Sequence, residues 1–389
     1  MKKILFISHD ASRTGAPILL LRLIEQIKNY ANFEVLILLK NEGELKEDFE
    51  KLGKTYLWNG HIQQAGFLEI FKERFCHKIG IKRLTAKQKY HLAILKEINE
   101  ADIIFNNTIT NAALLKDLSI KGKKIFSYFH ELHLITQSNC SKEDIAYLND
   151  ISEKIFVPSK AVKNFLIKDY NISPDRIAFL RYVIPEPKYP AKNSDIAAKK
   201  VIHDAKAFLI GFCGTIHWRK GYELLPLLAK RIVSDKKITG INFVWIGANK
   251  NSNEYLILKN DLEKLGLISY FTFIQPEKDI EPYLCQLDVL VLPSREDAFP
   301  LVVLEAAHYE VPCVYFSNAG GIGEFLGSDA GIAVEYLDID GMADAIIGLK
   351  QDADYNARLG KRAKEKIIEY SKPREIAEGL LQYFNNSSN

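Results

Sequence analysis

The sequence has no apolar run long enough to cross a membrane. Hydrophobic residues make up 47% of its 389 residues and charged residues 26%, an ordinary balance for a globular protein. No run reaches the roughly 18 apolar residues that a spanning helix needs. The start, MKKILFISHD, meets His9 and Asp10 after a short apolar stretch, so it predicts a first β-strand and not a signal peptide. The net charge of +3 is too small to indicate a nucleic-acid partner.

Three motifs with well-defined chemistry are also missing. There is no CxxC pair, which predicts reduced, mostly buried thiols in a cytoplasmic protein. A dinucleotide fingerprint needs G-x-G-x-x-G, but the first strand-to-helix turn has Gly15 alone, and this argues against a nicotinamide enzyme. No D-x-D follows an apolar strand. The nearest, Asp338-Ile-Asp340, is predicted to start a helix with caps, so we expect no metal site. The five cysteines are Cys76, Cys140, Cys213, Cys285 and Cys313.

Short apolar runs alternate with helical patterns such as Pro17–Asn29 and Tyr222–Val233. This alternation predicts an α/β fold of parallel sheets covered by helices on both faces. The first series of predicted strands is Lys3–Ser8, Glu34–Leu39, Ile103–Phe105, Lys124–Phe129, Lys154–Val157 and Ile177–Phe179. The second series is Phe208–Cys213, Asn242–Ile246, Phe271–Ile274, Val289–Leu292, Pro312–Phe316 and Gly331–Val334.

A proline-bearing stretch, residues 183–201, separates the two series and predicts an interdomain linker. We therefore expect a Rossmann-like acceptor-side domain at 1–185 and a Rossmann-like donor domain at 186–365. A C-terminal helix within 366–389 is expected to return to the first domain. Doubly wound sheets bind ligands outside the carboxyl ends of their strands. The predicted site is thus a cleft across which the two domains face each other.

The most specific segment is Pro293–Ala306, PSREDAFPLVVLEA, directly after a predicted strand. Pro300 suits a first helical turn, where its missing N–H costs nothing. The free N–H groups at Leu301 and Val302 would form an anion site for a diphosphate. Asp297 precedes the helix and Glu305 lies inside it, so one carboxylate could accept hydrogen bonds from a sugar and the other from a ribose.

This segment resembles the acidic motif of the retaining glycosyltransferase family 4, S-x-x-E-G-F-P-L-V-x-x-E-A. Ser294, Phe299 and Glu305 are in register with it. The chain departs at the first carboxylate, which is Asp297 with Glu296 beside it, so which of the two contacts the donor sugar stays open. The resemblance implies a GT-B fold and a nucleotide-sugar donor. It also implies that helix termini and basic side chains bind the diphosphate without an obligatory metal.

A second segment, FLIGFCGTIHWRKGYELL, resembles the family's donor-phosphate loop, G-R-L-x-x-x-K-G. Lys220 and Gly221 match, while Thr215 occupies the family's arginine position and an arginine stands instead at Arg219. A cation here would stabilise charge that grows on the leaving diphosphate. We expect this role for Lys220 first and Arg219 second.

Three further segments agree with the family in their order along the chain. GGIGEFLG resembles the family's G-G-x-x-E segment, with Glu324 as the acid. HDASRTGAPILLLRLI resembles the N-terminal glycine loop, with Gly15 at a helix start. His130 ends a strand and resembles the histidine that hydrogen-bonds the donor sugar. Ser159, in IFVPSKAVKNFL, is predicted to cap a helix.

One segment of the predicted acceptor-side domain has a basic, amphipathic pattern. Phe67–Tyr90 sets seven basic residues against one glutamate between Lys72 and Lys89, beside aromatic residues at helical spacing. Such a helix can lie on an anionic membrane, and many family members use lipid-linked acceptors. The alternative is a packed helix with a solvated basic face. Peripheral attachment to the inner face of the membrane therefore stays open.

The motif order predicts a retaining hexosyl- or pentosyltransferase that acts on a saccharide or a lipid-linked saccharide in surface polysaccharide or glycoconjugate synthesis. Two alternatives remain at this point. One is a nucleotide-sugar epimerase on the same fold. The other is a GT-B-like binding module without turnover, which the departures at Thr215 and Asp297 keep open. The donor sugar, its base, the acceptor and the linkage are not predicted.

Overall fold

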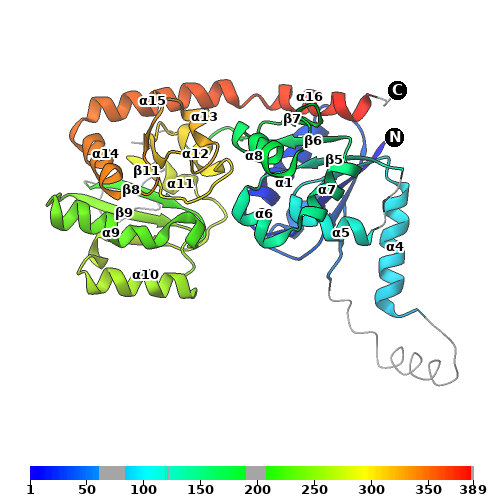
Figure 1. Cartoon of the computed structure of the whole chain (residues 1–389), viewed down its shortest axis with the longest axis horizontal. Coiled ribbons are helices and arrows are strands. Elements are labelled where there is room, and N and C mark those ends of the chain that lie inside the picture. The colour runs from blue at the N-terminus through cyan, green and yellow to red at the C-terminus, as the bar shows by residue number, and fades with distance from the viewer. Residues whose placement is uncertain (61–83, 119, 121, 190–206, 387–389) are drawn as a thin grey trace, which may run out of the picture. The chain divides into compact units, whose positions relative to one another are not determined.

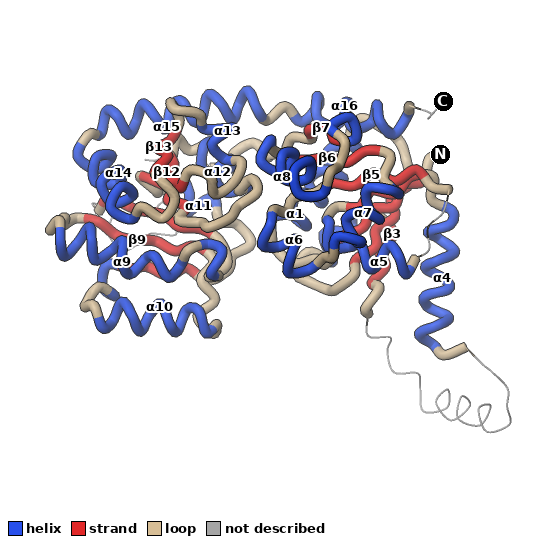
Figure 2. The backbone as a smooth tube through the Cα atoms, viewed as in Figure 1, coloured by secondary structure: helices blue, strands red, loops and turns tan. Residues whose placement is uncertain are grey.

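The computed structural model describes residues 1–60, 84–118, 120, 122–189 and 207–386 (Figures 1 and 2). The chain divides into two compact units. Unit 1 comprises residues 1–157, 166–180 and 374–389, and unit 2 comprises residues 158–165 and 181–373. No helix among the described residues is both long and apolar enough to cross a membrane.

Unit 1 is built on a parallel sheet of seven strands in the order β3-β2-β1-β4-β5-β6-β7. The strand β1 is apolar along almost its whole length and is buried from Ile4 to Ser8, as expected of a strand covered on both faces. The order reverses between β1 and β4, which are direct neighbours. The strands are β1 Lys3–Ser8, β2 Glu34–Leu39, β3 Lys54–Leu57, β4 Ile103–Asn106, β5 Lys124–Tyr128, β6 Lys154–Val157 and β7 Ile177–Phe179.

Helices cover both faces of this sheet (Figure 1). The last of them, α16, packs on it through aromatic contacts: the ring centroids of Phe126 and Phe384 are 5.3 Å apart, and those of Phe156 and Tyr383 are 5.1 Å apart. The C-terminal segment thus completes the core of unit 1. The helices are α1 Gly15–Lys28, α2 Lys46–Leu52, α4 Ala86–Glu100, α5 Ala112–Asp117, α6 His133–Asn139, α7 Lys142–Ile151, α8 Lys160–Tyr170, which begins in unit 2, and α16 Pro373–Asn385.

Unit 2 is built on a parallel sheet of six strands in the order β10-β9-β8-β11-β12-β13. Here the order reverses between β8 and β11, which are hydrogen-bonded neighbours. Both units are therefore doubly wound and Rossmann-like, which confirms the predicted fold class. The strands are β8 Phe208–Cys213, β9 Ile241–Ile246, β10 Phe271–Ile274, β11 Val289–Leu292, β12 Cys313–Phe316 and β13 Gly331–Val334.

One face of this sheet carries the main apolar core of unit 2, to which α9, α10 and α14 contribute. Asp338 caps α14 by accepting a hydrogen bond from the Gly341 N–H at 2.8 Å, as predicted. Ser159 caps α8 through the Val162 N–H at 3.3 Å, also as predicted. The helices are α9 Leu225–Ala229, α10 Asn253–Lys264, α11 Glu281–Leu284, α12 Leu301–Ala307, α13 Ile322–Leu326, α14 Ile339–Gln351 and α15 Ala353–Tyr370.

The twelve predicted strands are all present, with ends that differ by at most one residue, and two predictions need correction. The edge strand β3 was not predicted, because KTYL is short and only partly buried and so lacks the apolar run of the others. The predicted helix Tyr222–Val233 is interrupted. It consists of a 3-10 turn at Tyr222–Leu224, the short α9, and a π-helical stretch at Lys230–Asp235.

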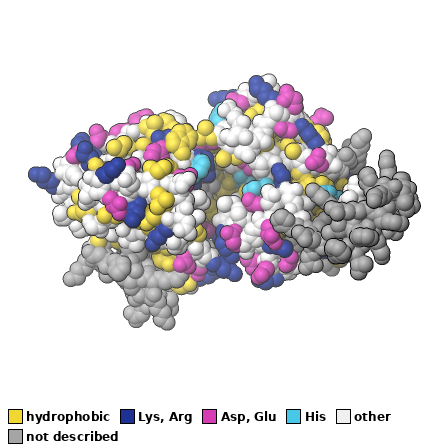
Figure 3. Space-filling view, turned by 90° about the horizontal axis from the view of Figure 1, so that it is seen from below, with side chains coloured by type: hydrophobic (Ala, Val, Ile, Leu, Met, Phe, Trp, Pro, Cys, Tyr) yellow, Lys and Arg dark blue, Asp and Glu magenta, His cyan; other side chains and the backbone are white. Residues whose placement is uncertain are grey.

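The predicted basic helix at Phe67–Tyr90 lies largely outside the described residues, which resume at residue 84. On the visible face of the described residues, Lys and Arg side chains are interspersed with Asp and Glu side chains (Figure 3). This mixture agrees with the small net charge of +3.

Candidate functional site

The donor-side motifs converge at one edge of the unit 2 sheet. The Lys-Gly loop follows β8, the acidic motif follows β11, and the GG-x-x-E segment follows β12. The strand order reverses between β8 and β11, and ligands of doubly wound sheets bind at that point, outside the carboxyl ends of the strands. Segments that are far apart in the sequence thus meet where such a fold binds its ligand.

Lys220 and Asp297 form an ion pair between the first two of these loops. Arg219 lies on the other side of the carboxylate. Its Nη1 is 3.8 Å from Asp297 Oδ1 and donates a hydrogen bond to the Glu296 carbonyl oxygen at 2.7 Å. The structure therefore brings together the two predicted cations and the predicted carboxylate. Glu296 contributes its backbone oxygen to this cluster.

The charge state of Asp297 follows from two opposing effects. Burial raises the pKa of this carboxyl, but the Lys220 and Arg219 cations beside it outweigh burial and hold the pKa below its usual range. Asp297 is thus an anion at neutral pH. These three side chains together carry one net positive charge, which favours contact with an anionic group of a ligand.

Two glycines permit the close approach of these loops. Gly221 has φ +73°, and a Cβ there would collide with the Pro293 carbonyl oxygen. Gly320 has φ +154°, and a Cβ there would collide with the Asp297 carbonyl oxygen. Beside it, the Asp297 N–H donates to the Ala319 carbonyl oxygen at 2.7 Å. These glycines therefore let the loops pack against the acidic motif itself.

The helix after the acidic motif, α12, begins at Leu301 with Pro300 as its N-cap, so Pro300 lies one position before the first turn. Because α12 follows β11, its N-terminus lies at the carboxyl edge of the sheet, and the N–H groups of Leu301 and Val302 have no acceptor within the helix. Glu305 is half-buried inside α12. Burial is the main cause that raises the pKa of the Cys213 thiol to about 12. The negative charge of Glu305 raises this pKa further, and the positive charge of Lys220 lowers it. Glu305 and Lys220 thus both lie near the end of β8.

Three other predicted donor-binding residues lie in different surroundings. Phe299 is buried, and its ring centroid is 5.6 Å from that of Tyr182 and 5.9 Å from that of Tyr370. Glu324 accepts hydrogen bonds from the N–H groups at 160 and 161, at 2.8 and 2.9 Å, and so caps the start of α8. Thr215 is exposed after β8. Phe299 and Glu324 thus have structural contacts, and their roles toward a donor stay predictions.

A second ion pair at this edge, between Arg295 and Glu223, is not predicted by the sequence. The Arg295 guanidinium lies 4.7 Å from the ring centroid of Trp218. The backbone N–H of Arg295 donates to the backbone carbonyl oxygen of Arg219 at 2.8 Å. These contacts hold the turn Trp218–Lys220 in place. The only signal in the sequence was that both partners stand beside motif residues.

In unit 1, the glycine loop and the strand-end histidine are joined through Asn107. Gly15 starts α1, and a Cβ at Gly15 would meet nothing within 4 Å. Asn107 donates its amide to the Ala16 carbonyl oxygen at 2.8 Å, so its Oδ1 is left to accept from His130 Nε2 at 3.2 Å. Burial, together with His9, lowers the pKa of His130 to about 3. His130 is therefore a neutral imidazole with its proton on Nε2.

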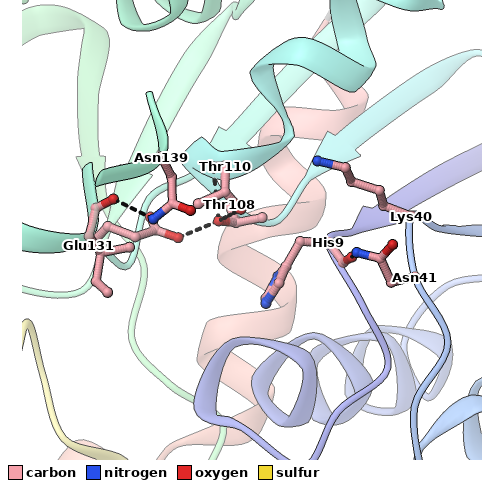
Figure 4. Close-up of a pocket in the computed structure, with 8 residues that line it drawn as sticks. His9, Lys40, Asn41, Thr108, Thr110, Glu131 and Asn139 are labelled. Atoms are coloured by element: carbon pink, nitrogen blue, oxygen red, sulfur yellow. Dashed lines mark hydrogen bonds between the residues drawn. The ribbon is translucent and has the colours of Figure 1, made fainter. Parts of the chain in front are cut away.

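A cavity of about 340 Å³ opens beside this network in unit 1 (Figure 4). Its lining residues are polar except for Ile135 and include His9, Lys40, Thr110, Glu131 and Asn139. These residues come from the carboxyl ends of strands β1, β2, β4 and β5 or the segments that follow them, on either side of the point where the strand order reverses. None of the five was predicted as a site residue. No motif marks Lys40, Thr110 or Asn139, and His9 and Glu131 lie within or beside predicted segments without matching a motif position.

Metal ligation was not predicted. No group of three or more His, Cys, Asp or Glu side chains in the described ranges is arranged to hold a metal ion.

Residues 193–366 match the family model described as glycosyl transferases group 1. N-acetyl-alpha-D-glucosaminyl L-malate synthase of Bacillus anthracis is 29% identical over 124 residues, which is 32% of each chain. The capsular polysaccharide biosynthesis glycosyltransferase CapM of Staphylococcus aureus is 23% identical over 384 residues, covering 92% of this chain and 98% of that protein. The chain thus spans about a third of the first relative's length and nearly all of the second's.

Among solved structures, Anabaena Alr3699/HepE in complex with UDP and glucose superposes with a TM-score of 0.80 over 100% of both chains, at 15% sequence identity. This likeness identifies the fold as GT-B.

Proposed function

We propose that the chain is a retaining glycosyltransferase that uses a nucleoside-diphosphate sugar, with its group 1 segment at residues 193–366 on a GT-B fold. We propose a saccharide or lipid-linked saccharide as acceptor, in the synthesis of a surface polysaccharide or glycoconjugate. The name of CapM supports this context, and the complex of HepE with UDP and glucose supports UDP as the nucleotide.

The observation that carries the proposal is the cluster of Lys220, Arg219 and Asp297 at the point where the unit 2 sheet reverses. In glycosyl transfer from such a donor, the bond between the sugar and the diphosphate breaks and negative charge grows on the leaving phosphate. Lys220 and Arg219 would stabilise that charge electrostatically, and the N–H groups of Leu301 and Val302 would add to it. Glu305 would accept hydrogen bonds from the ribose hydroxyls.

Retention follows from the family resemblance, which implies attack of the acceptor hydroxyl on the same face that the leaving group departs from. A donor phosphate oxygen would take the hydroxyl proton as the new bond forms. The protein's part is then to position the donor and to stabilise the diphosphate. We propose that His130, a neutral imidazole, hydrogen-bonds the donor sugar.

The test begins with thermal shift of the purified protein against UDP- and GDP-sugars, because a bound ligand stabilises the folded state. The stabilising donors are then incubated with oligosaccharide or lipid-linked acceptors, with and without excess EDTA. We expect transfer that survives EDTA and a product whose anomeric configuration, measured by NMR, equals that of the donor. Inversion would contradict retention, and loss of turnover in EDTA restored by magnesium or manganese would contradict the phosphate site. Epimerised donor without acceptor would indicate an epimerase, and the absence of any turnover would indicate a binding module.

A further inference from the structure

Arg295 joins the loop after β11 to the loop after β8, which carries Lys220. Its side chain forms an ion pair with Glu223, and its guanidinium lies 4.7 Å from the ring centroid of Trp218. Its backbone N–H donates to the Arg219 carbonyl oxygen at 2.8 Å. Two of these contacts therefore fall just before Lys220 in the sequence, and the third falls just after it.

The segment around Lys220 has little regular structure of its own to hold it. It consists of two 3-10 turns, Trp218–Lys220 and Tyr222–Leu224, joined at Gly221, which has φ +73°. Such turns are short, and their hydrogen bonds are less well aligned than those of an α-helix. A lysine side chain is also long and flexible, so the position of its ammonium depends on where the turn holds the backbone. Because Arg295 contacts both turns, it fixes the joint between them.

The charges indicate how Arg295 acts. Arg295 and Glu223 balance each other one to one, and their side chains are only 14% and 31% exposed. Lys220 and Arg219 instead share the single carboxylate of Asp297, which leaves one positive charge over. The pair of Arg295 and Glu223 thus adds no net charge to the site, and this favours an action on the loop rather than on a bound anion. A planar guanidinium suits such an action, because it can pair with a carboxylate and stack on an aromatic ring at once.

We propose that Arg295, together with Glu223, is a positioning residue that keeps Lys220 against Asp297, where the leaving diphosphate gains charge. The proposal rests on the proposed function, because that reaction is what makes the position of Lys220 matter. In this arrangement Arg295 itself has no contact with the diphosphate. Its loss should therefore lower kcat more than donor affinity, and should do so only while Lys220 is present.

The test replaces the pair without changing the net charge. The double variant Arg295→Met with Glu223→Gln removes both charges together, so no uncompensated charge is left behind. The control, Lys259→Met with Glu263→Gln, makes a matching exchange in an exposed i,i+4 pair of α10. Arg295→Lys keeps the charge but loses the planar stack on Trp218, so it should show the same changes in smaller size, and it replaces the double variant if that one does not fold. Circular dichroism and thermal unfolding verify folding.

The first measurement needs no ligand. Carbon NMR of the full chain, labelled at the carboxyl carbon of aspartate, follows the titration of Asp297, whose signal is identified by its absence in Asp297→Asn. In the wild type the cations beside Asp297 hold its pKa low against the effect of burial. If Lys220 moves away in the double variant, the pKa of Asp297 should rise, while the control should titrate like the wild type.

The second measurement is turnover with a donor that thermal shift identifies. We expect the double variant to lose kcat about tenfold or more, with donor KM changed less than about threefold, because misplacing a catalytic group by about 1 Å can cost about a hundredfold. In the Lys220→Gln background the same double replacement should change kcat by less than about twofold, since its effect runs through Lys220. The control pair should keep the wild-type kcat.

Three results would each overturn the proposal: an unchanged pKa of Asp297, an unchanged kcat in the double variant, or a full further loss of kcat in the Lys220→Gln background. Absence of turnover by the wild type with every donor would contradict the proposed function instead. The titration of Asp297 then decides by itself whether Arg295 holds Lys220 in place.

Discussion

Lys220 and Asp297, 77 residues apart in the sequence, form an ion pair that joins the loop after β8 to the loop after β11. Their side chains are only 17% and 15% exposed, so the pair is largely removed from water. In such surroundings a charge without its partner is costly. The pair therefore holds Lys220 at the edge of the unit 2 sheet where we propose that the diphosphate binds.

This pair makes stability depend on pH in the acid range. The pKa of Asp297 is lower in the folded protein than its ordinary value of 3.8. The unfolded chain therefore binds more protons in this window, so the pair's contribution is complete above pH 3.8 and is lost as pH falls through the folded pKa. We expect Asp297→Asn to lower the free energy of unfolding at pH 7. The gap between the variant and the wild type should narrow below pH 3.8.

Urea unfolding curves at several pH values measure this gap. Asp235→Asn is the control, because Asp235 is an exposed aspartate in an i,i+4 pair with Arg231, and its loss should change stability by less than about 0.5 kcal/mol. A gap between wild type and Asp297→Asn that stays constant from pH 7 to pH 2 would show that the pair does not lower this pKa.

The strands are marked by local signals in the sequence, whereas the contacts of the site are not. The strands were predictable because strands buried on both faces are apolar runs, as β1 and β11 show. The pairing of Lys220 with Asp297 was not predictable, although both residues were singled out, because it depends on which strands become neighbours. The contact of Glu324 was likewise not predictable from the sequence. Its carboxylate caps a helix start 164 residues earlier in the chain, a contact that no local pattern contains.

The prediction for Glu305 concerns nucleotide affinity. Glu305→Ala removes a charge-assisted hydrogen bond to the ribose, worth about 1.5–3 kcal/mol, or roughly 10- to 150-fold in affinity. Calorimetric titration with UDP and GDP measures this loss. The control Glu263→Ala removes an exposed glutamate of α10 and should bind nucleotide like the wild type. Equal affinity in Glu305→Ala and the wild type would refute the ribose contact.

Two glycine variants separate a folding role from a ligand role. Gly15→Ala adds a Cβ into open space at a helix start, so the melting temperature should hold or rise slightly. Its transfer activity should fall, since we expect a substrate phosphate to approach the backbone there. Gly320→Ala forces an alanine into φ +154° against the Asp297 carbonyl, so it should cost of order 1–3 kcal/mol of stability or more. Full activity in a well-folded Gly15→Ala variant would show that no substrate phosphate approaches the backbone of the glycine loop.

The prediction for Lys220 concerns the transition state. Its charge should matter more there than in the ground state, because the diphosphate gains charge as the sugar bond breaks. Lys220→Ala should therefore lower kcat by about 10²–10³-fold, with a smaller rise in donor KM. Lys220→Gln keeps most of the length without the charge and should be nearly as impaired. Lys230→Ala is the control, because Lys230 is an exposed lysine in the same unit.

Loss of Lys220 also leaves Asp297 with Arg219 as its remaining cation, at 3.8 Å, so a fall in kcat could arise from a destabilised loop. The double variant Lys220→Gln with Asp297→Asn separates the two causes, since neither residue then carries an uncompensated charge. We expect the double variant to regain the stability that the single variant loses, as measured by thermal unfolding, while kcat stays low. Recovery of kcat in the double variant would mean that Lys220 acts only by neutralising Asp297. A kcat of Lys220→Gln within about twofold of wild type would transfer the role to Arg219, which is next to it and contacts the same carboxylate.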